Sequence, residues 1–177
     1  MSVRGTTMKL EKLNFEKKKN RLIFMMKDCN PSFANTLRRL IIDEVPTLAV
    51  EEVEFRNNSS ALYDEMVAHR LGLSPLKTDL KSYTLPAKCS CNGAGCAQCQ
   101  LKITLKAGRK GTITTAEAKS EDPKCTFVYD MPIVKLSAKQ RIDLEATAVL
   151  GKGKVHTKWS PGLAFFRNEL VVDFDEK

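Results

Sequence analysis

The sequence predicts an α+β fold with mostly antiparallel sheet and few helices, on the strength of three observations. Several segments alternate apolar and polar residues, which is typical of strands with one wet face. One segment has the period of an amphipathic helix. Of the 177 residues, 42% are apolar and 28% are charged, a composition that favours a folded globular chain over a disordered one.

The expected strands follow one another with turn-forming residues between them. The strictest alternation runs over 141–150, where every second residue is apolar. A hairpin with a basic tip is expected over 8–15 and 21–27. The remaining expected strands are 48–55, 101–105, 112–115, 132–136 and 163–174.

The clearest helix is expected to begin at Pro31. Asn30 can cap it, proline suits the first helical position, and Pro46 ends it because the residue before a proline avoids the α conformation. Its apolar stripe consists of Phe33, Leu37, Leu40, Ile41 and Val45. The polar residues largely off the stripe include Asn35, Arg38 and Arg39. A helix this apolar must pack on two sides, or on its own sheet and a partner.

A second helix is expected after the polar loop that follows the strand 48–55. Ser59 or Ser60 can cap this helix, which should run to about Arg70. Its expected apolar face comprises Leu62, Met66, His69 and Leu73.

Four of the six cysteines lie close together, within the loop 86–100. Their spacing, Cys-x-Cys-x4-Cys-x2-Cys, forms two close pairs that can supply four corners of a tetrahedron around one structural Zn²⁺. Gly93 and Gly95 let the connecting loop bend with positive φ. The four candidate ligands are Cys89, Cys91, Cys96 and Cys99. The alternatives are free thiols with adventitious metal and an iron–sulfur cluster, for which the Cys-x-Cys pair is unusual.

Composition and missing motifs narrow the function classes. With 29 Lys and Arg against 21 Asp and Glu, the net charge of +8 favours a polyanion or an acidic partner. We expect no signal peptide and no membrane span, and a cytoplasmic location, because no long apolar segment is present. There are two histidines, and neither a phosphate-binding glycine loop nor a serine elbow is present. We therefore expect no catalytic residue and predict a scaffold or binding protein.

Five segments, taken in order, resemble the α-type subunits of RNA polymerases. They are 32–40 with 43–47, then 49–55, 68–76, 132–136 and 151–162. Within this family the sequence is most similar to the archaeal D subunits, which are the counterparts of the third-largest subunit of eukaryotic polymerase II. The resemblance extends over roughly residues 8–170.

The resemblance implies a two-domain architecture. A dimerisation domain of antiparallel sheet plus helices would comprise 1–48 and 159–177. An inserted β-rich domain, 49–158, would interrupt it and carry the cysteine loop 86–100. Eukaryotic relatives have a zinc loop of similar pattern in this domain, which fits one structural zinc, and an iron–sulfur cluster is not expected in so short a chain.

The resemblance also implies a non-catalytic assembly subunit of DNA-directed RNA polymerase. The chain would pair, through the apolar stripe, with a small α-like subunit of the L type, and the pair would nucleate binding of the large catalytic subunits. Asn35, Arg38 and Arg39 would contact a large subunit. Other small polymerase subunits are expected partners, and nucleic acid only indirectly.

A stand-alone zinc-binding module that binds nucleic acid is the alternative function. The net charge and the thiol cluster favour it. Against it, only Lys88 and Lys102 flank the cysteine loop, and no aromatic side chain for base stacking lies there.

Overall fold

Eight strands and two α-helices make up the described part of the chain, which is residues 8–170 and 172 of a computed structural model. All the pairings between these strands are antiparallel, which confirms the predicted α+β class. The chain divides into two compact units, one within 1–40 and 164–177 and the other over 41–163. Neither of the described helices has the length and apolar character needed to cross a bilayer.

The first unit contains the predicted hairpin. Strand β1 (Lys9–Glu16) pairs with β2 (Arg21–Lys27) around a single turn of 3-10 helix over Lys17–Lys19. Asn20 closes this turn in the left-handed conformation, with φ at 48°. Most side chains of both strands are exposed. The hairpin therefore forms as the sequence predicts, but this chain buries little of its apolar surface.

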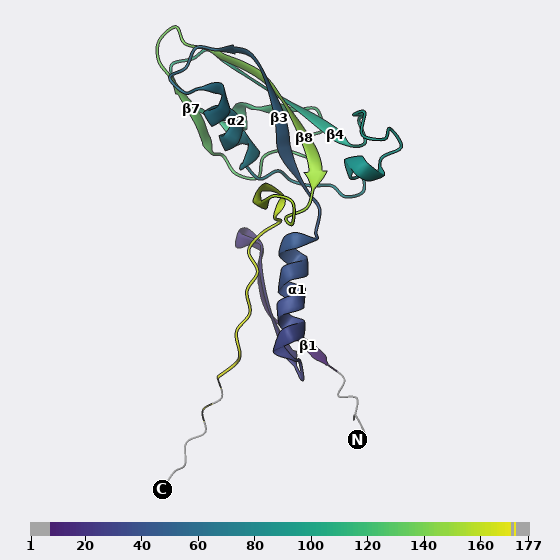
Figure 1. Ribbon diagram of the computed structural model, residues 1–177. Helices are drawn as coiled ribbons and strands as arrows, with labels where there is room; N and C mark the ends of the chain where they lie inside the picture. The colour runs from purple at the N-terminus through teal and green to yellow at the C-terminus, as the bar shows by residue number, and fades with distance from the viewer. Residues whose placement is uncertain (1–7, 171, 173–177) are drawn as a thin grey trace. The chain divides into compact units, whose positions relative to one another are not determined.

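Helix α1 (Pro31–Asp43) begins where the sequence predicts (Figure 1). Its end differs, because Val45, which the sequence places on the helical stripe, lies beyond the last helical residue. The backbone N–H of Ser32 donates to Asn30 Oδ1 over 2.8 Å, so Asn30 caps the first turn. The helix stops three residues before Pro46. Within α1, which is described throughout, only Ala34 is buried.

The second unit is built on a four-stranded sheet in the order β3–β8–β4–β6, with α2 (Asp64–Gly72) beside it. A separate ribbon of two strands packs in the same unit. The sheet strands are β3 (Thr47–Asn58), β8 (Ile142–Gly151), β4 (Gln100–Ala107) and β6 (Lys119–Ser120), and the ribbon pairs β5 (Gly111–Thr114) with β7 (Pro132–Leu136).

The core of this unit lies on one face of the four-stranded sheet. Along β8, buried residues alternate with half-buried ones over the whole strand, as the sequence predicts. In Figure 1, α2 lies between β3 and β7, and it contacts both strands. Val67 and Leu71 of α2 join the buried side chains of β4, β7 and β8 in one cluster. The sheet, α2 and the ribbon thus enclose a single hydrophobic core.

The predicted start of α2 is wrong, because the serines before it are engaged elsewhere. The helix begins at Asp64, not after Ser59 or Ser60. Ser60 donates its N–H and its hydroxyl to Asn58 Oδ1, over 3.1 and 2.7 Å. Its hydroxyl oxygen also accepts the N–H of Leu62. Ser60 therefore closes a polar turn rather than capping the helix.

The predicted apolar face of α2 is mostly wrong: Leu62 packs partly buried against the core, but His69 is exposed. Val67 and Leu71 are the buried residues, with exposed fractions of 0% and 1%. Met66 and Leu73, expected in the core, are 47% and 49% exposed. Both sets of residues recur at helical spacing, so periodicity alone does not choose between them. The tertiary fold selects the Val67 face.

The predicted last strand is not found in the described residues. Residues 163–170 and 172 have no strand conformation, and 171, 173 and 174 lie outside the described part. Within the described chain no strand pairs with this segment, and a strand without a hydrogen-bonded neighbour does not persist.

The turn after β8 folds back on the sheet and fixes its end. Trp159 is 7% exposed, and its Nε1 donates to the carbonyl oxygen of Val149 over 3.1 Å. The Thr47 hydroxyl donates to the carbonyl of Trp159. Gly151 lies directly under the indole ring, where a Cβ would overlap the ring. The segment 151–162 is thereby joined to the ends of β3 and β8.

Candidate functional site

The four clustered cysteines form a compact set of donors. All four Sγ atoms lie within 4.8 Å of one another. The separations are 3.5 Å for Cys89–Cys96, 3.5 Å for Cys91–Cys99 and 3.8 Å for Cys96–Cys99. A tetrahedral ion bound at about 2.3 Å by four thiolates would hold its sulfurs about 3.8 Å apart. The sulfur positions therefore fit one tetrahedral ion.

The backbone of the loop explains this convergence. Gly93 and Gly95 have φ values of 84° and 92°, which confirms the predicted positive φ. The N–H of Cys96 points to Cys99 Sγ over 3.3 Å. The base of the loop is closed by the N–H of Thr84, which donates to the Gln98 carbonyl over 2.8 Å, just before β4 begins. The loop is anchored on a core strand.

The thiols of the cluster favour different charge states. Hydrogen bonds, first from the backbone N–H of Cys91, lower the pKa of Cys89 to about 6. Burial raises the pKa of Cys99 to about 12. Cys89 and Cys99 are buried, whereas Cys91 and Cys96 are half-buried. Four thiolates can share this site only if a cation compensates their charge, as a bound metal ion would do.

The structure leaves the apolar stripe of α1 largely uncovered. Phe33 and Leu40 are each 49% exposed, and Val45 is 38% exposed. Leu37 and Ile41 are half-buried. Four of the five stripe residues lie on α1 and Val45 follows the helix, and the described residues of this chain bury the stripe only in part.

The polar residues of α1 include an oriented arginine. Arg38 is half-buried, and its Nε and Nη2 both donate to Asn35 Oδ1, over 3.1 and 3.0 Å. Arg39 is exposed one position further along. The Asn35 amide fixes the guanidinium plane of Arg38, so that the group is oriented before any partner binds.

Sequence reasoning missed how much further apolar surface the first unit exposes. The exposed hairpin leucines are Leu10, Leu13 and Leu22, at 63%, 52% and 53%. Phe165 and Leu170, in the C-terminal segment of the same unit, are 79% and 91% exposed. The apolar run 21–27 was the available signal, because it is too apolar for a strand that faces water. Exposed apolar surface on this scale is typical of regions where proteins bind one another.

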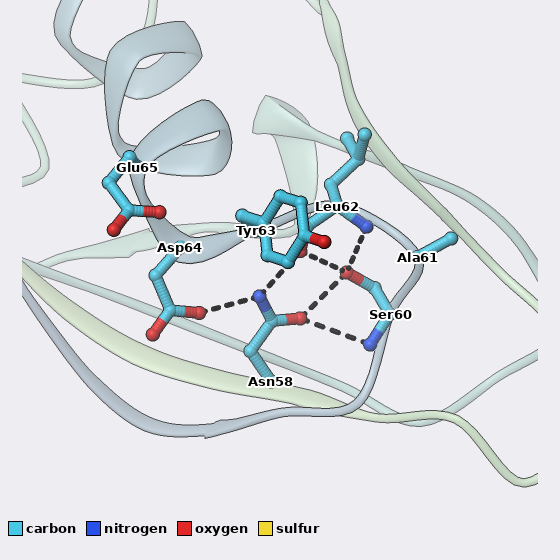
Figure 2. Close-up of a pocket in the computed structure, with 7 residues that line it drawn as sticks. All are labelled: Asn58, Ser60, Ala61, Leu62, Tyr63, Asp64 and Glu65. Carbon is cyan, nitrogen blue, oxygen red and sulfur yellow. Dashed lines mark hydrogen bonds between the residues drawn. The ribbon is translucent and has the colours of Figure 1, made fainter.

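A hollow of about 450 Å³ lies at the junction of β3 and α2. Figure 2 shows that its polar groups are joined to one another. Asn58 Nδ2 donates to Asp64 Oδ1 over 2.7 Å and to the Leu62 carbonyl over 2.9 Å. Because these groups satisfy one another, the hollow is a hydrogen-bonded turn that supports α2.

Comparison with known proteins gives a consistent result over most of the chain. A family model, the RNA polymerase Rpb3/RpoA insert domain, matches residues 53–173. The DNA-directed RNA polymerase subunit Rpo3 of Methanosphaera stadtmanae is 41% identical over 150 residues, which cover 81% of this chain and 55% of that relative.

Two further relatives with the same printed name come from Pyrococcus. Identity to the protein of Pyrococcus furiosus is 41%, with 89% of this chain and 58% of the relative covered. Identity to that of Pyrococcus horikoshii is 40%, with 92% of this chain and 61% of the relative covered. The chain thus spans between half and two thirds of the length of these relatives.

Proposed function

Since the chain belongs to the family of the RNA polymerase Rpb3/RpoA insert domain, we propose that it is a non-catalytic assembly subunit of DNA-directed RNA polymerase. It pairs with a small α-like subunit of the L type, and the pair nucleates binding of the large catalytic subunits. One observation carries this proposal: the apolar surface that the first unit leaves exposed.

The surface that pairs with the α-like subunit includes the stripe of α1. Apolar side chains at this exposure are costly in water and are stable when a second chain covers them. A helix packed into this face would bury both edges of the stripe. The side chains assigned to the pairing interface are Phe33, Leu37, Leu40, Ile41 and Val45.

The polar side of α1 is the contact for a large subunit. Arg38 is held by Asn35, so its guanidinium loses little freedom when it binds a carboxylate. Arg39 adds a second cation one residue away. Arginine guanidinium groups suit a polar contact with a large protein surface, because they form charged hydrogen bonds.

We assign 1–48 and 159–177 to the dimerisation domain and 49–158 to the inserted domain. The separation of the first compact unit, within 1–40 and 164–177, from the unit that carries the sheet supports this division.

The cysteine loop holds one structural Zn²⁺, with Cys89, Cys91, Cys96 and Cys99 as ligands. The tetrahedral sulfur separations support this assignment. Sulfurs within 4.8 Å of one another leave room for one ion, which favours zinc over an iron–sulfur cluster. Four thiolates leave no open coordination position, so the ion stabilises the loop and does no chemistry on a substrate.

Replacing Cys89 and Cys91 together by serine tests the ligand assignment. We expect the variant to lose one zinc per chain, measured by elemental mass spectrometry, and to gain fast amide exchange over 86–99. Exchange in β4 and β8 should stay slow because the core does not depend on the loop. Cys29→Ser, outside the cluster, is the control and should keep its zinc. An unchanged metal content in the double variant would contradict the assignment.

Native mass spectrometry of the tagged chain, purified from its own cells, tests the assembly role. We expect a mass series that contains a small α-like subunit, the large polymerase subunits and one zinc per chain. A chain that purifies alone, with no polymerase subunit at stoichiometric amounts, would contradict the proposal.

A second candidate function, a nucleic-acid-binding module, has one observation in its favour. Lys17, Lys18 and Lys19 are all exposed at the hairpin tip. Glu16 Oε2 lies 3.4 Å from Lys19 Nζ, and Glu16 Oε1 lies 2.6 Å from Arg21 Nη2. The Glu16 carboxylate therefore offsets part of this positive charge. Binding of the free chain to duplex DNA that weakens steeply between low and physiological salt would support this function.

A further inference from the structure

Helix α2 presents apolar side chains on its outer face as well as on its inner face. Val67 and Leu71 fill the core, and Tyr63, Met66 and Leu73 remain 78%, 47% and 49% exposed. Tyr63 also lines the hollow at the junction of β3 and α2, where Asn58 and Asp64 hydrogen-bond to each other. Helix α2, which has nine residues, therefore has one apolar face in the core and a second apolar face that is exposed.

The chain that carries a further exposed tyrosine runs beside the residues that follow α2. Leu76 forms an antiparallel bridge with Phe127, and the N–H of Val128 donates to the Pro75 carbonyl over 2.9 Å. This pairing brings the chain around Tyr129 alongside the residues that follow α2. Tyr129 is 62% exposed. The patch so formed, which we call the α2 patch, consists of Tyr63, Met66, Arg70, Leu73 and Tyr129.

Arg70 stands in the middle of the α2 patch, between Met66 and Leu73 on the helix. Its Nη1 donates to the carbonyl oxygen of Ile133 over 2.7 Å, which anchors the guanidinium to β7. Within the described residues, neither Nε nor Nη2 of Arg70 has a hydrogen-bond acceptor, and the side chain is exposed. An anchored guanidinium with two further donors is suited to a carboxylate, because two N–H groups match two carboxylate oxygens and little side-chain entropy is lost.

We propose that the α2 patch binds a segment of another subunit of the same polymerase, in which an Asp or Glu carboxylate stands between apolar side chains. The carboxylate pairs with Arg70, and the apolar side chains cover Met66 and Leu73. This inference rests on the proposed function, because it needs an assembly in which the two chains meet.

Composition and charge support an occupant of this chemistry. Tyrosine, methionine and arginine are the residues enriched where proteins bind one another. The net charge of +8 favours a partner that carries carboxylates. Glu65, exposed near the start of α2, repels carboxylates at that end and so directs the partner's acid toward Arg70.

The size of the α2 patch argues against a second copy of this chain as the occupant. Five partly exposed side chains offer a few hundred Å², whereas a stable interface buries roughly 800 Å² on each partner. Such a patch is too small to hold two free chains together. It is sufficient for a chain that is already held elsewhere in the same assembly, because tethering gives it a high effective concentration.

Hydroxyl-radical footprinting of the free chain and of the assembled polymerase tests coverage of the α2 patch. We expect labelling of Met66 and Tyr63 to fall about tenfold on assembly, as for side chains that become fully desolvated. Equal labelling of Met66 in both samples would overturn the inference. If no polymerase is recovered with the chain, the proposed function fails. If the polymerase is intact and Met66 stays reactive, only the present inference fails.

Two variants test the chemistry of the contact. Arg70→Lys keeps the charge but lacks the paired guanidinium donors, and it should restore Met66 labelling in the assembled polymerase about tenfold. Met66→Glu places a like charge against the partner's acid and should restore Tyr63 labelling similarly. Leu80→Glu, at a site 53% exposed and outside the patch, is the matched control and should leave both protections in place. Protection that persists in both variants would overturn the role of the α2 patch.

Cross-linking identifies the occupant. A photoreactive benzophenone side chain placed at position 66 should cross-link to a peptide of another polymerase subunit that carries an Asp or Glu between apolar residues. A cross-link to a second copy of this chain, to nucleic acid, or to a peptide without a carboxylate would overturn the proposal.

Discussion

Similar patterns of apolar residues are buried in one compact unit and exposed in the other. In the sheet-bearing unit, alternation along β4 buries every second residue, and Leu101 is 1% exposed. In the hairpin of the first unit, Leu10 and Leu13 belong to a similar alternation and are 63% and 52% exposed. An amphipathic pattern therefore shows that a surface will be buried, but it does not show whether the covering layer lies in the same chain.

The difference comes from the layer that covers each pattern. The four-stranded sheet has α2 and the ribbon β5–β7 on its apolar face, and their side chains form one core. The hairpin is a sheet of only two strands. Two strands without a covering layer are marginal in water, which is the reason for proposing that a second chain covers the first unit.

Two leucine-to-alanine variants test the comparison most strongly. Leu101→Ala should lower the free energy of unfolding by about 2–5 kcal/mol, because it leaves a cavity in a closed core. Leu40→Ala, on the exposed stripe, should change it by less than about 0.5 kcal/mol in the isolated chain. Urea denaturation followed by circular dichroism measures both values. Equal losses would show that the stripe of α1 is already covered within this chain.

Substitutions on the stripe of α1, which should change stability little, should have large effects on partner binding. Leu37→Asp puts an unpaired charge in the proposed interface and should weaken pairing with the α-like subunit by about 2 kcal/mol or more, since a buried charge without a partner is costly. Isothermal titration calorimetry with the purified subunit measures the loss. Ser32→Asp, an exposed site off the stripe, is the control. Wild-type affinity in Leu37→Asp would place the interface elsewhere.

The sequence predicts those parts of the fold that local chemistry decides. The start of α1 follows from its cap at Asn30, and the bend of the cysteine loop follows from Gly93 and Gly95. These features depend on a few neighbouring residues whose conformational preferences are strong.

The sequence does not predict features that depend on distant neighbours. Met66 and Val67 are both apolar, and only contact with β3 and β7 decides which one turns inward. The candidate metal ligands could be found from spacing alone, whereas the α2 patch could not, because Arg70 and Tyr129 become neighbours of one surface only through the pairing of Leu76 with Phe127.

Gly151, the last residue of β8, and Gly162 give a test with a smaller expected effect. A Cβ at Gly151 would overlap the Trp159 ring, so Gly151→Ala should lower the free energy of unfolding by about 1–3 kcal/mol through overpacking. Gly162→Ala meets no atom within 4 Å and is the control. Thermal unfolding monitored by tryptophan fluorescence should separate the two variants. Equal stability would mean that Trp159 does not rest on the sheet in solution.

The smallest expected effect concerns the charges on the outer face of the sheet. Glu145 receives hydrogen bonds from Lys102 Nζ and Arg56 Nη2, each over 2.7 Å. The hydrogen bond from Lys102 is the main cause that lowers the pKa of Glu145 below 4.5. A carboxylate whose pKa is lowered by folding stabilises the protein above its unfolded pKa, and this stabilisation is lost as the pH falls through the folded pKa.

Glu145→Gln should therefore be less stable than the parent chain at pH 7 and equally stable once the pH is below both pKa values. Urea denaturation at a series of pH values measures this gap, which is the difference in free energy of unfolding between the variant and the parent chain. Glu11→Gln removes the pair with Lys27 in the hairpin, where both side chains are more than half exposed, and should give a smaller gap because exposed pairs contribute little. A Glu145→Gln deficit that persists at low pH would assign the loss to packing rather than to charge. A larger gap for Glu11 would mean that the hairpin, and not the sheet, depends more on its charges.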